Sequence, residues 1–171
     1  MEIALVGDSH VPFGVEEVPG EVMEAVEDAD LVLHTGDFDS RKAFRIFAEA
    51  SESFAAVRGN MDPSALSIPT SQDFDVGDTT FLLTHGTDGV DAVLDEARDV
   101  GAEVAVYGHS HEPADVERDG VRLVNPGSCT GADPASRATY AVLDLRVDGF
   151  DVEIREVEDA GADDAEEDET G

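Results

Sequence analysis

Short apolar runs alternate with segments of helical periodicity in the first sixty residues of this chain. The three runs cover residues 2–7, 30–34 and 54–57. Each run has the length and the branched side chains of a buried strand. Between the runs, residues 21–29 and 41–50 repeat apolar side chains at helical spacing, and Ser40 can cap the second helix. The order strand, helix, strand, helix, strand predicts right-handed crossovers and a parallel sheet.

The second half of the chain has more strands and fewer helical segments. Strands are expected at residues 72–76, 79–84, 102–107, 115–117 and 121–124, and on both sides of Asp148-Gly149. One helix is expected over residues 89–100 and is closed by Gly101. Turn signals at Gly77-Asp78, Asp119-Gly120 and Asp148-Gly149 indicate tight connections. We therefore predict that the second half consists of antiparallel hairpins.

Five of the predicted strands end in a glycine-containing turn that carries oxygen or nitrogen ligands. These candidate ligands are Asp8, His10, Asp37, Asn60, His85, His109 and His111. Ligands gather beyond the carboxyl ends of strands in open sheets, so we expect these side chains to converge. Two carboxylates, four imidazoles and an amide can hold two metal ions that share one carboxylate. The set is too rich in nitrogen for magnesium or calcium, and it lacks the cysteines of a structural zinc cage.

His109 and His111 form the densest part of this pattern. Taken alone, an H-x-H pair is more often two exposed loop histidines than a metal site. The partners at the four other strand ends favour the metal site. Side chains at i and i+2 of an extended segment point the same way, which by itself suggests that both rings bind one ion.

The ligand series also resembles a known family. Its blocks are Asp8-Ser9-His10, Gly36-Asp37, Gly59-Asn60, His85-Gly86 and Gly108-His109-Ser110-His111. In this order and spacing they are similar to the five-block signature of the calcineurin-like metallophosphoesterases. Residues 59–62 and 125–128 resemble the small single-domain branch, which includes archaeal and bacterial phosphodiesterases and a retromer subunit. The resemblance implies an α/β fold, a four-layer α/β/β/α sandwich of two mixed β-sheets flanked by helices.

The resemblance also implies a binuclear centre. Metal one would be held by Asp8, His10, Asp37 and His111, and metal two by Asp37, Asn60, His85 and His109. Asp37 would bridge the ions, and Asp37, Asn60 and His109 would be the catalytic residues. The implied cofactors are two divalent transition-metal ions, Mn²⁺ first and Zn²⁺, Fe²⁺, Ni²⁺ or Co²⁺ as alternatives. The implied reaction is hydrolysis of a small phosphodiester by a hydroxide that bridges the two metals.

Several residues near these blocks are open to two interpretations. Met61 stands where many relatives carry a histidine that protonates the leaving group, so we expect good leaving groups such as aryl esters to be favoured. Asp39 and Asp62 are either groups that orient ligands or plain surface acids. Arg58 is expected to form a structural ion pair, with a phosphate contact as the alternative. The other expectations concern a buried strand histidine, His34, an inert Cys129, and an ordinary turn at residues 125–128.

The charge of the chain is extreme. Its 41 acids and 10 bases give a formal net charge of −31, and nine of the ten bases are arginine. Because the acids spread along the whole chain, we interpret them as a halophilic surface, with a basic protein partner as the alternative. At about 1 M salt the Debye length is about 3 Å, which screens the self-repulsion. The charge argues against non-specific binding to nucleic acid or anionic lipid.

The lengths of the apolar runs, the single cysteine and the composition of the last residues predict the localisation and the domain limits. The apolar runs are far shorter than the roughly 20 residues of a membrane span. The single cysteine, Cys129, fits a reducing compartment, so we expect a cytoplasmic protein without membrane contact. We expect one metallophosphoesterase domain over residues 1–157 and an acidic, disordered tail over residues 158–171. A homo-oligomer is left open.

The sequence leaves three functions in competition. A metal-dependent phosphodiesterase explains why all seven ligand positions are filled. A non-catalytic protein-binding scaffold on the same fold has no physical need for four converging histidines. A phosphomonoesterase or a nucleotide pyrophosphohydrolase would use the same metals, and only the substrate separates it from a phosphodiesterase.

Overall fold

The computed structural model describes residues 1–158, so the tail expected over residues 158–171 lies, except for Glu158, outside the described residues. The helices are α1 (Gly20–Asp28), α2 (Arg41–Ala50) and α3 (Val90–Val100). The strands are β1 (Glu2–Val6), β2 (Leu31–His34), β3 (Phe54–Ala56), β4 (Ser71–Val76), β5 (Thr79–Thr84), β6 (Val104–Val106), β7 (Ala114–Arg118), β8 (Val121–Asn125), β9 (Thr139–Arg146) and β10 (Gly149–Glu156). The elements expected from the sequence are confirmed, and their predicted ends lie within two residues of these bounds.

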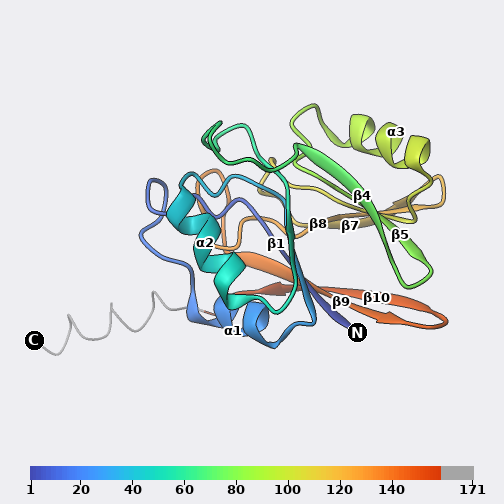
Figure 1. Ribbon diagram of the computed structural model, residues 1–171, viewed down its shortest axis with the longest axis horizontal. Coiled ribbons are helices and arrows are strands. Elements are labelled where there is room, and N and C mark those ends of the chain that lie inside the picture. The colour runs from blue at the N-terminus through green and yellow to red at the C-terminus, as the bar shows by residue number, and fades with distance from the viewer. Residues whose placement is uncertain (159–171) are drawn as a thin grey trace, which may run out of the picture.

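The strands form two five-stranded sheets (Figure 1). The first has the order β10-β9-β1-β2-β3, in which β1, β2 and β3 run parallel as predicted. The hairpin β9-β10 joins this sheet through an antiparallel pairing of β9 with β1. The second sheet has the order β4-β5-β6-β8-β7.

The prediction that the second half consists only of antiparallel hairpins is wrong. The strands β5, β6 and β8 run parallel to one another, and only the β4-β5, β7-β8 and β9-β10 pairs are hairpins. The reason is helix α3, which carries the chain from the end of β5 back to the start of β6. A helical crossover between neighbouring strands of one sheet makes them parallel.

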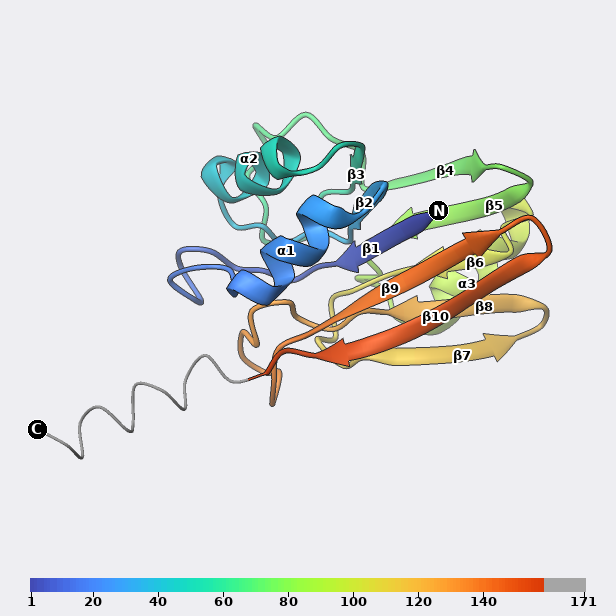
Figure 2. The ribbon, with the colours of Figure 1, turned by 90° about the horizontal axis from the view of Figure 1, so that it is seen from below.

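Alternating side chains of the strands separate three apolar cores, which makes the molecule a four-layer sandwich. Along β1, Ala4 and Val6 pack with α1 and α2, whereas Ile3 and Leu5 face the second sheet. Along β5, Phe81 and its alternate neighbours face the first sheet, and Leu82 packs under α3. Figure 2 shows the two sheets stacked, with α1 and α2 beside the first sheet and α3 against the second. The α/β/β/α sandwich of two mixed sheets is confirmed.

Two helix termini are capped as their sequences predict. The Ser40 side chain accepts a hydrogen bond of 3.1 Å from the Ala43 N–H, which caps α2. Gly101 closes α3 in the left-handed conformation, with φ of 71°. The helices are 9, 10 and 11 residues long, and within residues 1–158 none is long and apolar enough to cross a membrane.

Candidate metal centre

The seven candidate ligands lie together at the carboxyl ends of five strands, as the pattern predicts. The first sheet supplies Asp8 and His10 after β1, Asp37 after β2 and Asn60 after β3. The second sheet supplies His85 after β5, and His109 and His111 after β6. Asp8, His10 and His111, here called cluster one, offer ligand atoms within 4.8 Å of one another. Asp37, His85 and His109 do the same and, with Asn60, are called cluster two.

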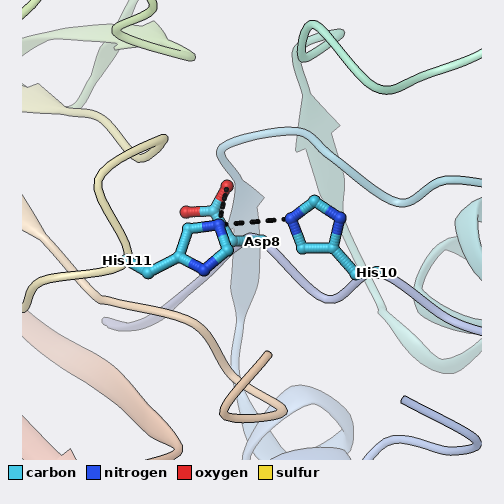
Figure 3. A group of neighbouring side chains, drawn as sticks. All are labelled: Asp8, His10 and His111. Carbon is cyan, nitrogen blue, oxygen red and sulfur yellow. Dashed lines mark hydrogen bonds and ion pairs between the residues drawn. The ribbon is translucent and has the colours of Figure 1, made fainter. Parts of the chain in front are cut away.

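Cluster one brings three ligand atoms face to face (Figure 3). His10 Nε2 lies 3.2 Å from His111 Nε2, and His111 Nε2 lies 3.7 Å from Asp8 Oδ1. Asp8 Oδ1 is buried and has no hydrogen-bond partner among residues 1–158. A buried carboxylate oxygen without a partner is costly unless a cation or another donor satisfies it.

The other ring nitrogens of cluster one fix which nitrogens carry lone pairs. His10 Nδ1 lies 2.9 Å from both carboxylate oxygens of Asp39, and His111 Nδ1 lies 2.9 Å from the Ala132 carbonyl oxygen. Both acceptors require an N–H, so in the neutral rings the two Nε2 atoms hold lone pairs that face each other. Such histidine–carboxylate and histidine–carbonyl pairs are the usual support of metal-binding imidazoles. The arrangement fits a divalent cation between the rings.

Cluster two gathers acceptors in the same way. His85 Nε2 lies 2.9 Å from Asn60 Oδ1 and 3.3 Å from Asp37 Oδ2, and His109 Nδ1 lies 3.1 Å from Asn60 Oδ1. His85 Nδ1 donates to the Thr35 carbonyl oxygen at 2.7 Å, which leaves Nε2 free to bind. The mixture of imidazole, carboxylate and amide donors suits divalent transition metals.

Asp37 lies between the two clusters. Its Oδ2 atom is 3.3 Å from His85 Nε2 in cluster two and 3.6 Å from His10 Nε2 in cluster one. Its Oδ1 atom accepts a 2.8 Å hydrogen bond from the Met61 N–H. The carboxylate therefore faces both clusters, which is the placement that the predicted bridging role needs.

Burial and neighbouring charge move the pKa values of the carboxyl groups in opposite directions. Burial raises the pKa of Asp8 to about 6, although His85 and His111 pull it down. Burial also acts to raise the pKa of Asp37, but the hydrogen bond and charge of His85, with the Met61 N–H and His10, lower it overall. Asp37 in turn raises the pKa of His85 against the effect of its burial.

Asp62 ties the two loops that carry Asp37 and Asn60. Its carboxylate accepts four backbone N–H bonds of 2.7–3.0 Å, from Asp37, Phe38, Asp39 and Gly59. Asp37, Asp39 and Asp62 also come within metal-binding distance of one another. Because these four N–H groups already bond both oxygens of Asp62, this third group of acids is explained without a metal. The sequence left Asp39 and Asp62 undecided, and the structure assigns both to the support of ligands.

The ligand loops adopt backbone conformations that L-residues rarely use. Five of the seven candidate ligands have positive φ, namely Asp8, His10, Asp37, His109 and His111, at 47–77°. Backbone strain of this kind concentrates at functional sites. The loops also approach closely, because a Cβ atom on Gly59 would lie 2.1 Å from Asp37 Oδ1. The positive φ values cannot be seen in the sequence, because the residues in these conformations are not glycines.

The loop over residues 125–128 is more than the ordinary turn expected from its sequence. Ser128 Oγ donates to the Asp8 carbonyl oxygen at 2.7 Å, and Asn125 Nδ2 donates to Ser110 Oγ at 3.0 Å. The loop therefore braces both strand ends that supply cluster one. Sequence reasoning missed this role because a Pro-Gly turn gives no sign of what it packs against.

Three further side chains with sequence-based expectations are His34, Cys129 and Arg58. His34 is fully buried, accepts from the Gly36 N–H and lies 3.3 Å from Ser9 Oγ, so it is a satisfied strand histidine. Burial raises the pKa of the Cys129 thiol to about 12, in agreement with an inert cysteine. The ion pair expected for Arg58 is absent within residues 1–158, where its guanidinium makes no hydrogen bond either.

A comparison with known proteins agrees with this geometry. The model of the calcineurin-like phosphoesterase superfamily domain matches residues 1–148. The chain belongs to this superfamily. A probable metallophosphoesterase of Methanothermobacter thermautotrophicus is 33% identical over 162 residues, which cover 90% of this chain and 91% of the relative.

Solved structures of the superfamily share the fold. An archaeal phosphodiesterase superposes with a TM-score of 0.73 at 26% identity, covering 91% of this chain and 100% of its own. A Vps29 protein of Entamoeba histolytica, solved in complex with Zn²⁺, superposes with a TM-score of 0.78 at 21% identity, covering 92% of this chain and 98% of its own. Enzymes and vacuolar protein sorting proteins therefore both occur on this fold.

Proposed function

We propose that this protein is a binuclear metal-dependent phosphodiesterase whose catalytic domain spans residues 1–157. Metal one is assigned to Asp8, His10, Asp37 and His111. Metal two is assigned to Asp37, Asn60, His85 and His109. The family match and the relatives named as phosphodiesterases support the reaction class.

One observation carries the proposal. Lone pairs of His10 and His111 face each other at 3.2 Å beside the unpartnered, buried Asp8 Oδ1. Without a cation this arrangement is repulsive, which supports a bound metal ion at cluster one. When bound, two divalent ions would supply a nucleophile at neutral pH and would neutralise charge on the phosphate.

The chain's own residues prepare this chemistry. Asp39 and the Ala132 carbonyl hold the cluster one rings, and Asp62 holds the backbone of Asp37 in place. The two carboxylates assigned to the ions leave about two positive charges of four uncompensated. A diester anion would therefore be attracted to the centre although the protein as a whole carries −31.

The leaving group would receive little help from a protein acid. Met61, at the position where many relatives have a histidine, is 58% exposed and lines the opening above the centre. Phe13, 78% exposed, lines the same opening and adds apolar surface. Aryl diesters, which leave without protonation and can pack against these side chains, are therefore the expected favoured substrates.

The test uses full-length protein in about 1 M KCl with manganese, where screening keeps the acidic chain folded. Bis-p-nitrophenyl phosphate should be hydrolysed, and His109→Ala should abolish turnover without changing the circular dichroism spectrum. Glu112→Gln, an exposed neighbour outside the ligand set, serves as the matched control and should keep turnover. Equal turnover in His109→Ala and the wild-type protein would refute the assignment.

Met61→His provides a second test of the mechanism. Restoring a protonating group should raise turnover of alkyl diesters more than that of aryl diesters, by up to about 10²-fold. A leaving-group series measured on both proteins gives the two slopes. Identical slopes would show that position 61 plays no part in protonation.

Only a measurement of turnover can separate the phosphodiesterase from a non-catalytic scaffold, because both can bind metal. A Vps29 structure is itself described as complexed with Zn²⁺, so bound metal does not distinguish an enzyme from a scaffold. A panel of diesters, monoesters and nucleotide pyrophosphates, offered with Mn²⁺, Zn²⁺, Fe²⁺, Ni²⁺ and Co²⁺ in turn, separates the alternatives. No turnover with any of these combinations would favour the scaffold.

A further inference from the structure

A polar cavity of about 510 Å³ opens beside cluster two. Asn60 and His85, both assigned to metal two, form part of its wall. The rest of the wall comes from the segment after β3, from the loop after β5 and from the first turns of α3. The volume lies in the range of small-molecule sites and exceeds what a single phosphate needs. A substrate held at the metals would therefore extend into this cavity.

Arg58 is the only arginine or lysine in the cavity wall. It is half-buried, and within residues 1–158 its guanidinium makes no hydrogen bond and no ion pair. Seven of the other eight arginines pair with a carboxylate within 4.0 Å, and Arg41 donates to a carbonyl oxygen. In a chain with 41 acids, a half-buried arginine without an acidic partner stands out. Its charge is left for a ligand to neutralise.

The acids in the same wall either accept hydrogen bonds from other groups or are exposed to solvent. Both oxygens of Asp62 accept backbone N–H bonds, and Glu96 accepts a hydrogen bond from the Ser71 hydroxyl. Asp88 is exposed. None of the three lies within ion-pair distance of Arg58. The cavity therefore has a free cation although it has more acids than bases.

The other donors of the wall suit the same kind of ligand. Hydroxyl groups of Ser64, Thr70 and Thr87 line the cavity. The N-terminal turn of α3 also lines it, and Gly89 at the N-cap supplies no side-chain acceptor for the free N–H groups there. These groups can donate to phosphate oxygens around a guanidinium, which binds phosphate in a bidentate manner.

We infer that this cavity binds a second phosphate group of the substrate and that Arg58 is the residue that selects for it. The inference rests on the phosphodiesterase function proposed above. It narrows the substrate to diesters whose retained part carries another phosphate, such as a nucleoside with phosphates on both its 3′ and 5′ oxygens. The scissile diester lies at the metals, and the second phosphate lies against Arg58.

The experiment uses two substrates with the same leaving group. One is the p-nitrophenyl ester of thymidine 5′-phosphate, and the other carries an additional 3′-phosphate. Metal-loaded wild-type protein should prefer the second substrate in kcat/KM by about 10-fold or more, as expected for a charged hydrogen bond of about 1.5–3 kcal/mol. Arg58→Met should remove this preference mainly through KM, and Arg58→Lys should keep part of it.

Lys42→Met is the matched control, because it removes one positive charge from α2, outside the cavity. It should leave the ratio of the two kcat/KM values unchanged, which separates a local contact from a change in net charge. Thymidine 3′,5′-bisphosphate binding, measured by calorimetry on wild-type and Arg58→Met proteins, provides a readout that does not depend on turnover. We expect at least about 10-fold weaker binding to Arg58→Met.

The outcomes distinguish this inference from the function on which it rests. If the wild-type protein hydrolyses both esters equally and Arg58→Met binds the bisphosphate as well as the wild type, the cavity assignment is overturned and the phosphodiesterase stands. If neither ester is hydrolysed, the proposed function fails. The calorimetric comparison then still decides whether Arg58 binds the second phosphate.

Discussion

Cluster one is more enclosed by the protein than cluster two, although Asp37 and His85 of cluster two are also buried. In cluster one, Asp8 and His111 are buried, and both histidines are held through their second ring nitrogen. In cluster two, Asn60 and His109 are exposed, and His109 Nε2 has no hydrogen-bond partner within residues 1–158. A site with fixed ligands loses less freedom when it binds a metal. The comparison suggests a tight first metal and a more exchangeable second metal.

The open side of the centre is also the side where substrate can enter. Cluster two borders the cavity that contains Arg58, whereas the opening near Met61 is lined by both clusters, through His10 and His111 as well as Asn60 and His109. Cluster one is braced by the loop over residues 125–128. On the proposed function, enclosure would fix one metal and exposure would leave the other beside the substrate. The predictions below test this division, beginning with the largest expected effect.

Asp37→Asn should remove the distinction between the clusters, because its carboxylate faces both of them. We expect loss of tight binding at both sites and a fall in phosphodiester turnover of about 10³-fold or more. Metal analysis after gel filtration and a turnover assay measure the two effects. One full equivalent of retained metal would show that Asp37 does not serve both sites.

His111→Ala and His109→Ala should separate the clusters. The first variant should lose the tight metal and the second the exchangeable metal, each with an affinity loss above the roughly 10–100-fold typical of supporting residues. Calorimetric titration of chelator-treated protein with Mn²⁺ resolves the two binding steps. Identical titration curves for the two variants would contradict the division.

Asp8 and Asp37 should give the metal-free protein opposite pH dependences. The pKa of Asp8 is raised by burial from 3.8 to about 6, so its contribution to stability is present below about pH 3.8 and is lost as pH rises through 6. Relative to Asp8→Asn, the free energy of unfolding should fall by about 2–3 kcal/mol between pH 4 and 7. The pKa of Asp37 is lowered overall, so its contribution is lost as pH falls below the ordinary value.

Urea unfolding in the presence of a chelator measures these profiles, with each Asn variant as the reference for its own carboxylate. The reference removes the pH dependence common to the many surface acids. Parallel profiles for the wild-type protein and Asp8→Asn would show that burial does not raise the pKa of Asp8.

Asp39→Asn should have the smallest effect and should act on cluster one alone. The amide can still accept from His10 Nδ1 but carries no charge to support the ring. We expect about 10-fold weaker binding of the tight metal and unchanged binding of the second. Calorimetric titration measures both steps, and Asp133→Asn, an exposed acid that makes no hydrogen bond or ion pair with the candidate ligands, serves as the control. Equal weakening at both sites would show that Asp39 supports the whole centre.

Most of the fold followed from periodicity, and the parts that did not follow have a physical reason. Each strand and helix was found because its apolar pattern is local. The parallel arrangement of β5, β6 and β8 was missed, because strand direction depends on which neighbours pair and not on the strand's own residues. The pairing of β9 with β1, far apart in the chain, gave no local signal either.

The candidate site shows the same limit. Seven ligand positions were predicted because each follows a strand that ends in a glycine-containing turn, and their metal-binding roles remain predictions. Asp62 and the loop over residues 125–128 could not be assigned, because their partners are backbone groups of distant segments. Arg58 was expected to pair with an acid, and only the structure shows that no acid among residues 1–158 reaches it.

The sequence by itself determined which side chains are candidates for metal binding, since their types and their places after strands can be read from the chain. Only the tertiary structure decided how these side chains divide between cluster one and cluster two. Asp8 and His10 come from the first sheet and His111 from the second, so cluster one exists only when the two sheets pack against each other. Burial between the sheets then raises the pKa of Asp8, leaves its oxygen without a partner and separates an enclosed cluster from an open one. Burial depends on all the surrounding elements together, and no local pattern of residues encodes it.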